Sequence, residues 1–273
     1  MEKFILTQKN NIWFGSYPRL TAAGFTNACS CRVHGESALI HGLFNLALHV
    51  GDEKELVLAN RRKFAAALGV NPKRFTTCAQ VHGSKICVVT ESLVGAGALD
   101  YATTVASTDS LITNLEDVPL MLFYADCVPV LLADTVTGAI GLAHAGWRGT
   151  VAGIVAETVA AMKKNFGSSG KNIIAAIGPS IGGCCYEVDD KVRVQADDWQ
   201  EFFSPVPGIE GKYLFDLWGC NRRQLELAGI PYQNIISPGI CTAHNSELFC
   251  SYRAEHGKTG RMGVCICRKS NKG

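Results

Sequence analysis

The chain has 273 residues and a formal net charge of +2, with 47% hydrophobic and 18% charged residues. This length and composition exclude a disordered chain and supply enough apolar side chains for a sizeable buried core. The small net charge argues against a nucleic-acid or anionic-membrane partner, because such partners usually leave a clear basic excess. A local site for a small anion is still compatible with it.

Apolar runs in the chain are short. The N-terminal segment carries only one, residues 4–6, which is too short for the core of a signal peptide. The nearest approach to a membrane span, residues 118–132, carries Asp126 in its middle. We therefore expect a cytoplasmic protein that neither spans nor binds a membrane and whose twelve cysteines stay reduced. In such a chain, clustered Cys and His indicate a metal or catalytic site, although most free cysteines are small buried hydrophobes.

The predicted elements start with a helix over residues 54–69, which has apolar residues at helical spacing and ends in Gly69. Strands are predicted over residues 75–82, 85–90, 119–125, 128–132 and 139–144, which are rich in Val, Ile, Leu and Phe. A second helix covers residues 150–167, with Thr150 as its N-cap, Lys163 and Lys164 near its negative end, and Gly167 after it. A third helix covers residues 217–229. The longest loops are predicted at residues 95–108 and 198–211.

The order of these elements bears on the fold class. Strands and helices do not alternate regularly, which favours an α+β fold with mixed β-sheets and flanking helices over a doubly wound sheet. We find no internal repeat, low-complexity tract or linker rich in Pro and Ser. The sequence therefore predicts a single domain over residues 1–273.

The stretch "YADCVPVLLADTVTGAIGLAHAGWRGT", residues 124–150, places two apolar runs around the turn sequence "DTVTG", with glycine where a positive φ is usual. If the runs form a hairpin, Ala133 pairs with Ala139, and Cys127 falls opposite His144 or Ala145. Opposed residues have Cβ atoms about 5 Å apart. A cysteine sulfur and a histidine nitrogen there can bind one ion, and mixed Cys and His ligands in a tetrahedral site are typical of zinc.

A third ligand is needed for such a site. His82 in "CAQVHGSK" is the favoured candidate, because it ends an apolar run beside a glycine. Spacing alone leaves the alternatives open: His34, His41, His49, His244 and His256. Three protein ligands with an open fourth position are typical of catalytic zinc, whereas four protein ligands form a structural site.

Charged residues near these ligands suggest further roles. Arg148 in "AGWRGT" adds a planar charge near a predicted helix start, which suits an oxyanion, although a salt bridge is an equal alternative. Asp109 in "STDSLIT" is a candidate to accept an imidazole N–H, its alternative being a turn. Strand alternation puts the side chain of Asp126 on the face opposite Cys127, which favours a structural role at least equally.

The remaining cysteines include three close pairs: Cys29 with Cys31, Cys184 with Cys185, and Cys265 with Cys267. None has the C-x-x-C spacing that favours shared coordination. We therefore expect buried thiols at these positions in preference to a second metal site.

Six segments together resemble a known family. They are "QVHG" (80–83), "STDSLIT" (107–113), "ADCVPVLLAD" (125–134), "AHAGWRGT" (143–150), "IGPSIGGCCYEV" (177–188) and "SYR…TGRM" (251–262). In this order and spacing the chain resembles the YfiH-type family, which was long labelled multi-copper polyphenol oxidoreductase or laccase and is now described as purine nucleoside phosphorylase. The resemblance covers residues 24–266 and implies that His82, Cys127 and His144 bind the metal. It also implies a single α+β domain similar to the catalytic domain of cytotoxic necrotizing factors.

The function implied by this resemblance is zinc-dependent phosphorolysis of adenosine, inosine and methylthioadenosine, with adenosine deamination at the same site. Copper is the alternative metal. Purine nucleosides and phosphate are then the partners, for a monomer or homodimer. Catalysis would involve the three metal ligands and Asp109. The candidate substrate-binding residues are Arg148, Arg32, Ser37, Asn45 and Arg253. The segment "CRVHGESA", which contributes Arg32 and Ser37, departs from the usual family pattern by having His34 where glycine is expected.

Other functions remain open. A cysteine hydrolase would use Cys127 as nucleophile and His144 as base. A copper-dependent phenol oxidase would need many histidine ligands, and seven scattered histidines without an H-x-H pair argue against it. A purely structural zinc domain would need a fourth protein ligand, which the sequence does not identify.

Overall fold

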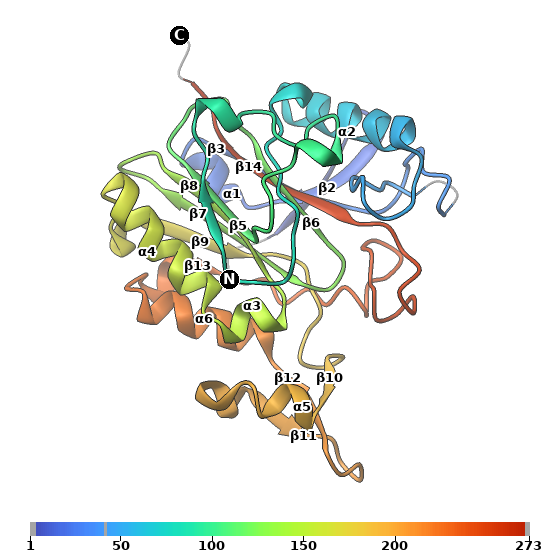
Figure 1. Cartoon of the computed structure of the whole chain (residues 1–273), viewed down its shortest axis with the longest axis vertical. Helices are drawn as coiled ribbons and strands as arrows, with labels where there is room; N and C mark the ends of the chain where they lie inside the picture. The colour runs from blue at the N-terminus through green and yellow to red at the C-terminus, as the bar shows by residue number, and fades with distance from the viewer. Residues whose placement is uncertain (1–3, 41–42, 271–273) are drawn as a thin grey trace.

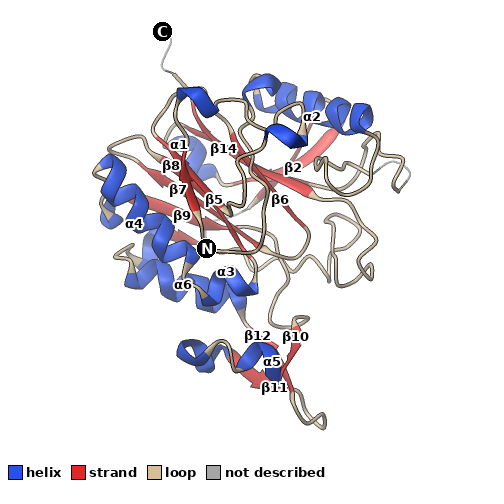
Figure 2. Cartoon of the chain, in the orientation of Figure 1, coloured by secondary structure: helices blue, strands red, loops and turns tan. Residues whose placement is uncertain are grey.

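Two β-sheets packed face to face form the centre of the molecule, and helices cover their outer faces (Figures 1 and 2). This arrangement comes from a computed structural model that describes residues 4–40 and 43–270. The layers run from α2 through a five-stranded sheet and a six-stranded sheet to α4 and α6. The predicted combination of mixed sheets and flanking helices is confirmed.

The five-stranded sheet is antiparallel throughout. Its strands, in spatial order, are β1 (Ile5–Lys9), β2 (Ile12–Ser16), β3 (Phe25–Ser30), β14 (Met262–Arg268) and β6 (Leu120–Tyr124). On its outer face lies α2 (Lys54–Leu68), whose Phe64 packs against Phe44 and Phe75. This helix ends where the sequence predicts, because Gly69 adopts the left-handed conformation at φ 65°.

The six-stranded sheet is mixed. Its strands, in spatial order, are β13 (Ile235–Ile236), β9 (Ile173–Ile177), β7 (Val128–Asp134), β8 (Ile140–Ala145), β5 (Ser110–Thr113) and β4 (Ile86–Val88). The outer pairs β13–β9 and β4–β5 are parallel, and the inner pairs are antiparallel. The helices α4 (Ile154–Phe166) and α6 (Leu217–Leu227) cover its outer face.

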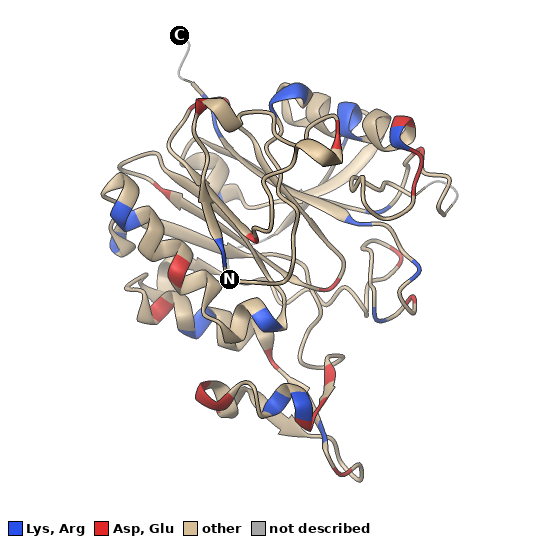
Figure 3. Ribbon diagram, viewed as in Figure 1, with Lys and Arg blue, Asp and Glu red and all other residues tan. Residues whose placement is uncertain are grey.

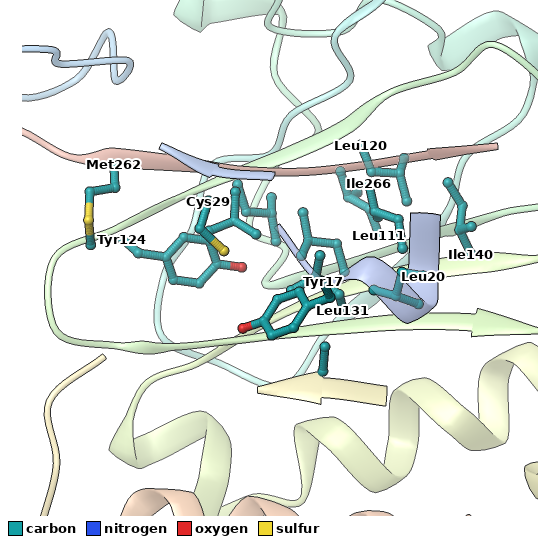
Figure 4. Packing of buried hydrophobic residues seen from close by; sticks show 14 of the residues in the cluster. Tyr17, Leu20, Cys29, Leu111, Leu120, Tyr124, Leu131, Ile140, Met262 and Ile266 are labelled. Carbon is teal, nitrogen blue, oxygen red and sulfur yellow. The ribbon is translucent and has the colours of Figure 1, made fainter. Parts of the chain in front are cut away.

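The main core lies between the two sheets (Figure 4). Leu131 and Ala133 of β7 face this core, whereas the alternate residues Val130 and Leu132 face the helices. Both faces of β7 are therefore buried, which explains its unbroken apolar sequence. The hydroxyl of Tyr124 on β6 donates to the carbonyl oxygen of Ala143 on β8 at 3.0 Å and so joins the two sheets.

A small three-stranded sheet projects from the body at the bottom of Figure 1. It contains β10 (Glu187–Asp189), β12 (Lys212–Phe215) and β11 (Phe203–Pro205), with the short α5 (Asp190–Arg193) beside it. Charged residues are frequent here and on the outer helices, and sparse in the two central sheets (Figure 3).

The remaining short helices are α1 (Pro18–Ala22), α3 (Trp147–Val151) and the 3-10 turns Pro72–Arg74, Glu91–Leu93, Tyr101–Thr103, Gly170–Asn172, Asp197–Phe202 and Tyr232–Asn234. Among the described residues, we find no helix with the length and apolar character to span a membrane.

Three predictions of local structure are wrong. The helix predicted over residues 150–167 is two helices, because Gly153 adopts φ 77° and separates α3 from α4; Thr150 lies inside α3. The strand predicted over residues 75–82 makes only isolated bridges, from Thr76 to Leu120 and from Cys78 to Val105. The loop predicted over residues 198–211 contains a 3-10 turn and β11.

Candidate metal centre

His82, Cys127 and His144 meet at one end of the six-stranded sheet, where their potential ligand atoms lie within 4.8 Å of one another. Cys127 directly precedes β7, His144 lies in β8, and His82 comes from the loop before β4. The two imidazole rings are 4.9 Å apart between centroids and nearly perpendicular, at 75°. The structure thus brings together the three residues favoured as ligands from the sequence.

The hairpin that places Cys127 and His144 has a different register from the predicted one. Ala133 pairs with Ile140 instead of Ala139, and His144 lies opposite Pro129. The register differs because Asp134 belongs to β7 and its backbone N–H donates to Ala139, which leaves only residues 135–138 in the turn. Cys127 is therefore a diagonal neighbour of His144 on the same face, still within reach of its ring.

Gly146, directly after β8, leaves room for the three ligands. A Cβ atom at this position would lie 3.0 Å from Cδ2 of His82 and 3.1 Å from Sγ of Cys127. Any side chain here would push one of these groups away. Glycine is therefore required at this position of "HAGWRG" for steric reasons, because a larger residue would displace a ligand.

Asp109 connects the two histidines and is fully buried. Its Oδ1 accepts a hydrogen bond from Nδ1 of His144 at 2.9 Å and another from the backbone N–H of His82 at 2.9 Å. Its Oδ2 accepts from the backbone N–H groups of Val81 and Gly83. These bonds hold His82 in a left-handed conformation at φ 61°, and they leave Nε2 of His144 as the nitrogen for a metal.

The charges within the centre favour metal binding. Burial alone would raise the pKa of Cys127, but the neighbouring imidazoles of His144 and His82 lower it to about 6. Burial would lower the pKa of His144, but Cys127 and Asp109 raise it to about 9. Although burial opposes it, the hydrogen bonds to His144 and the backbone keep the pKa of Asp109 below its usual value. Cys127 is thus a thiolate near neutral pH, the form that binds metals.

This donor set fits a thiophilic ion. One thiolate and two imidazoles provide three ligands, and the histidine oriented by a carboxylate is an arrangement common around zinc. The fourth position would face the adjoining cavity. Zinc and copper both accept these donors.

A cavity of about 550 Å³ opens beside the three ligands. Three arginines line it: Arg148, Arg253 and Arg261. Arg148 is exposed and stacks on Trp147, with its guanidinium carbon 4.2 Å from the ring centroid. The cavity also has an aromatic lining of Phe123, Trp147, Tyr186 and Tyr252, together with His49, Gln80, Ala125, Asp126, Ile181 and Leu217. Its size and mixture of aromatic and cationic groups suit a small aromatic ligand with an anion.

Arg32, Ser37 and Asn45 are not among the described residues that line this cavity. Arg32 forms an ion pair with Glu255 at 2.7 Å. Ser37 and Asn45 both donate to Asp52 and stabilise the loop before α2. The structure therefore gives these three residues structural contacts and does not bring them to the site with Arg148 and Arg253.

Asp126 does line the cavity, but both of its carboxylate oxygens are engaged. Oδ1 accepts from the hydroxyl of Thr242 and Oδ2 from the backbone N–H of Arg253, each at 2.6 Å. Its side chain thereby attaches a distant segment to the end of the sheet. Among the alternative histidines, His49 lines the cavity, and burial with nearby Arg261 and Arg61 lowers its pKa to about 4. His41 lies outside the described residues.

Several residues that line the cavity were not predicted from the sequence to have a role in the site. Gln80 and Arg261 lie within motifs that the sequence analysis singled out, "QVHG" and "TGRM", yet no role was assigned to them. Gln80 bonds to both backbone groups of Phe123 on β6, at 2.8 and 2.9 Å, and so anchors the loop that carries His82. Tyr186 and Tyr252 likewise come from quoted motifs, and only their placement in the fold shows that they share a wall.

Fold and site together define a mixed α/β protein with a candidate His, Cys and His metal centre in a cavity of substrate size. The family model described as multi-copper polyphenol oxidoreductase laccase matches residues 26–269, so the chain belongs to that family. The sequence is 41% identical over 250 residues to a Geobacillus stearothermophilus protein named purine nucleoside phosphorylase YlmD, covering 90% of this chain and 91% of the relative. A Bacteroides thetaiotaomicron protein named purine nucleoside phosphorylase is 35% identical over 229 residues, or 82% and 84% of the two chains.

Solved structures show the same architecture. The crystal structure of YlmD from Geobacillus stearothermophilus has a TM-score of 0.90 at 37% identity, covering 98% of this chain and 100% of the other. The Bacillus licheniformis hypothetical protein YfiH has a TM-score of 0.89 at 36% identity, covering 94% of this chain and 96% of the other.

Proposed function

We propose that this chain is a zinc-dependent purine nucleoside phosphorylase that acts on adenosine, inosine and methylthioadenosine and also deaminates adenosine at the same site. The observation that carries the proposal is that three candidate metal ligands and three arginines share one cavity. The printed names of the relatives, purine nucleoside phosphorylases at 35–41% identity, support the same reaction class.

Phosphorolysis needs a bound phosphate beside C1′ of the nucleoside. The guanidiniums of Arg148 and Arg253 suit this anion, because a planar donor pairs with phosphate oxygens and carries a permanent charge. Arg148 is the stronger candidate, since Arg253 already donates to the carbonyl oxygens of Cys185 and Glu187. In the reaction, a phosphate oxygen forms a bond to C1′ while the C1′–N9 bond breaks. The electron pair of the C1′–N9 bond leaves with the purine.

The aromatic side chains suit the purine itself. Tyr186, Tyr252 and Trp147 offer flat apolar surface that can pack on a base and exclude water from the breaking bond. A bound zinc would supply Lewis acidity, which stabilises negative charge on a departing purine and lowers the pKa of water for deamination. Asp109 would keep the imidazole of His144 oriented during both reactions.

A product assay tests this function. Zinc-loaded protein is given adenosine, inosine or methylthioadenosine, with and without phosphate, and the products are separated by chromatography. We expect free base that appears only with phosphate, and inosine from adenosine without phosphate. The variant Cys127→Ala should lose both, whereas Cys87→Ala, which removes a partly exposed thiol outside either Cys/His group, should retain them.

One observation favours a second candidate. A thiolate at Cys127 beside a protonated His144 is also the catalytic pair of a cysteine hydrolase. The same two residues therefore fit this second function. Absence of turnover of all three nucleosides by protein with verified zinc content would refute the phosphorylase. Rapid alkylation of Cys127 in that same zinc-loaded protein would then support the hydrolase, because a zinc-bound sulfur is not available for attack.

A further inference from the structure

A second group of potential metal ligands lies outside the candidate centre. Four side chains present ligand atoms within 4.8 Å of one another: Cys184, Cys185, Cys241 and His244. We call this group the cysteine-rich cluster. From the sequence alone, the adjacent pair Cys184 and Cys185 was not expected to bind a metal, because it lacks C-x-x-C spacing. The fold supplies the other two ligands from a segment more than fifty residues later.

The geometry within the cluster is close to that of a metal site. Sγ of Cys185 lies 3.1 Å from Nε2 of His244, and Sγ of Cys184 lies 3.7 Å from Nδ1 of the same ring. Neighbouring ligand atoms around a tetrahedral zinc are roughly 3.5–3.8 Å apart, given Zn–S bonds near 2.3 Å and Zn–N bonds near 2.0 Å. The two sulfurs approach different nitrogens of the ring, so one nitrogen and three sulfurs surround a single ion once the side chains rotate toward it.

The backbone presents the ligands without help from an ion. Residues 182–186 form a tight turn in which the N–H groups of Cys185 and Tyr186 both donate to the carbonyl oxygen of Gly182. The N–H of Gly182 in turn donates to Sγ of Cys241 at 3.3 Å, a bond that orients this sulfur. The two segments are joined by the bridge between Ser180 and Cys241.

We propose that the cysteine-rich cluster binds one zinc ion as a closed structural site, separate from the candidate centre at Cys127. Three thiolates and one imidazole complete four-fold coordination by protein alone, which is the pattern of structural zinc. Simple burial of free thiols does not explain the group, because Cys184 and His244 are exposed and Cys185 is only partly buried.

Such a site would fix one wall of the cavity. The turn that carries Cys184 and Cys185 also carries Tyr186 and directly follows Ile181, and both of these residues line the cavity. Arg253, another lining residue, donates to the carbonyl oxygens of Cys185 and Glu187. A zinc ion that joins this turn to residues 241–244 would hold these contacts in place without touching the ligands at Cys127.

Measuring the zinc content of the protein tests this proposal independently of catalysis. Protein purified with zinc and a reductant is dialysed against metal-free buffer and analysed by mass spectrometry of the elements. We expect roughly two zinc ions per chain for the native sequence and for Cys87→Ser, and roughly one for Cys241→Ser and for Cys127→Ala. A native chain that holds one zinc, lost in Cys127→Ala and retained in Cys241→Ser, would overturn the proposal and leave the proposed function intact.

Cobalt substitution provides a second readout that does not depend on the folding of Cys241→Ser. In the Cys127→Ala background, the candidate centre has no sulfur, so sulfur-to-cobalt charge-transfer absorption in the near ultraviolet must come from elsewhere. We expect this absorption in Cys127→Ala, and its loss when the exposed Cys184 is also changed to Ser. Absence of the band in fully reduced Cys127→Ala exposed to excess Co²⁺ contradicts the site.

Discussion

Asp109 contacts both histidines of the candidate centre through its carboxylate. It accepts from the ring of His144 and from the backbone of His82, and it is fully buried. An aspartate at this position was expected to accept an imidazole N–H, and the structure gives it that bond. The sequence could not show its three bonds to backbone N–H groups, because these depend on how the loop before β4 folds.

Replacing this carboxylate should weaken metal binding. In Asp109→Asn, one oxygen must serve donors that two oxygens serve now, and the new NH₂ group faces N–H groups. We expect zinc affinity at the centre to fall about 10- to 100-fold. This affinity is measured by competition with a chromophoric chelator. The measurement uses the Cys241→Ser background, so that zinc bound at the cysteine-rich cluster does not contribute. Asp52→Asn is a matched control: it also removes an acceptor of side-chain and backbone bonds but lies away from the centre.

A pH profile separates positioning by Asp109 from a general loss of stability. Zinc must displace the proton that His144 holds up to a pKa of about 9, so affinity rises with pH towards that value. Because Asp109 helps to raise this pKa, the rise should end at a lower pH in Asp109→Asn. A profile that keeps its shape while the affinity falls would mean that Asp109 only supports the fold.

At the scale of elements, the hairpin β7–β8 determines where the ligands lie. The turn sequence "DTVTG" correctly indicated a hairpin with Gly138 at positive φ, here 72°. The register differed because Asp134 is part of the strand and donates to Ala139, which closes a shorter turn than pairing of Ala133 with Ala139 implies. The helix after β8 was mispredicted for a similar reason: Gly153 interrupts an apolar pattern that continues across it.

Gly146, where β8 ends, offers a test of this element. In Gly146→Ala, the added methyl would lie 3.0–3.1 Å from His82 and Cys127, so a ligand must move. We expect zinc affinity to fall at least about 10-fold, with a parallel loss of phosphorolysis. The affinity is measured in the same chelator competition. Gly141→Ala is the control within β8, because the nearest neighbours of its methyl would be Met162, Ile112 and Leu132 and no ligand of the centre. Equal affinity in the two variants would contradict a steric role for Gly146.

At the scale of the whole molecule, the cavity assembles residues from segments far apart in the chain. The sequence predicted the three candidate metal ligands that meet in the cavity, two of its arginines and the combination of sheets and helices. His49, Gln80 and Arg261 could not be placed, because they reach the cavity only through the packing of loops around the two sheets. The cysteine-rich cluster escaped for the same reason: its ligands are brought together by pairing between residues 180 and 241.

Because these ligands join distant segments, zinc should stabilise the entire chain. An ion that binds the native but not the unfolded chain adds about 4 kcal/mol when its free concentration is a thousand times its Kd. With two such ions in a protein of this size, we expect chelation to lower Tm by roughly 20 °C. Differential scanning fluorimetry of zinc-loaded and chelator-treated protein measures the shift. The double variant Cys127→Ala/Cys241→Ser has lost a ligand at each group, so its Tm should not respond to the chelator. An unchanged Tm in native protein whose zinc has verifiably been removed would show that the two groups do not contribute to stability through metal.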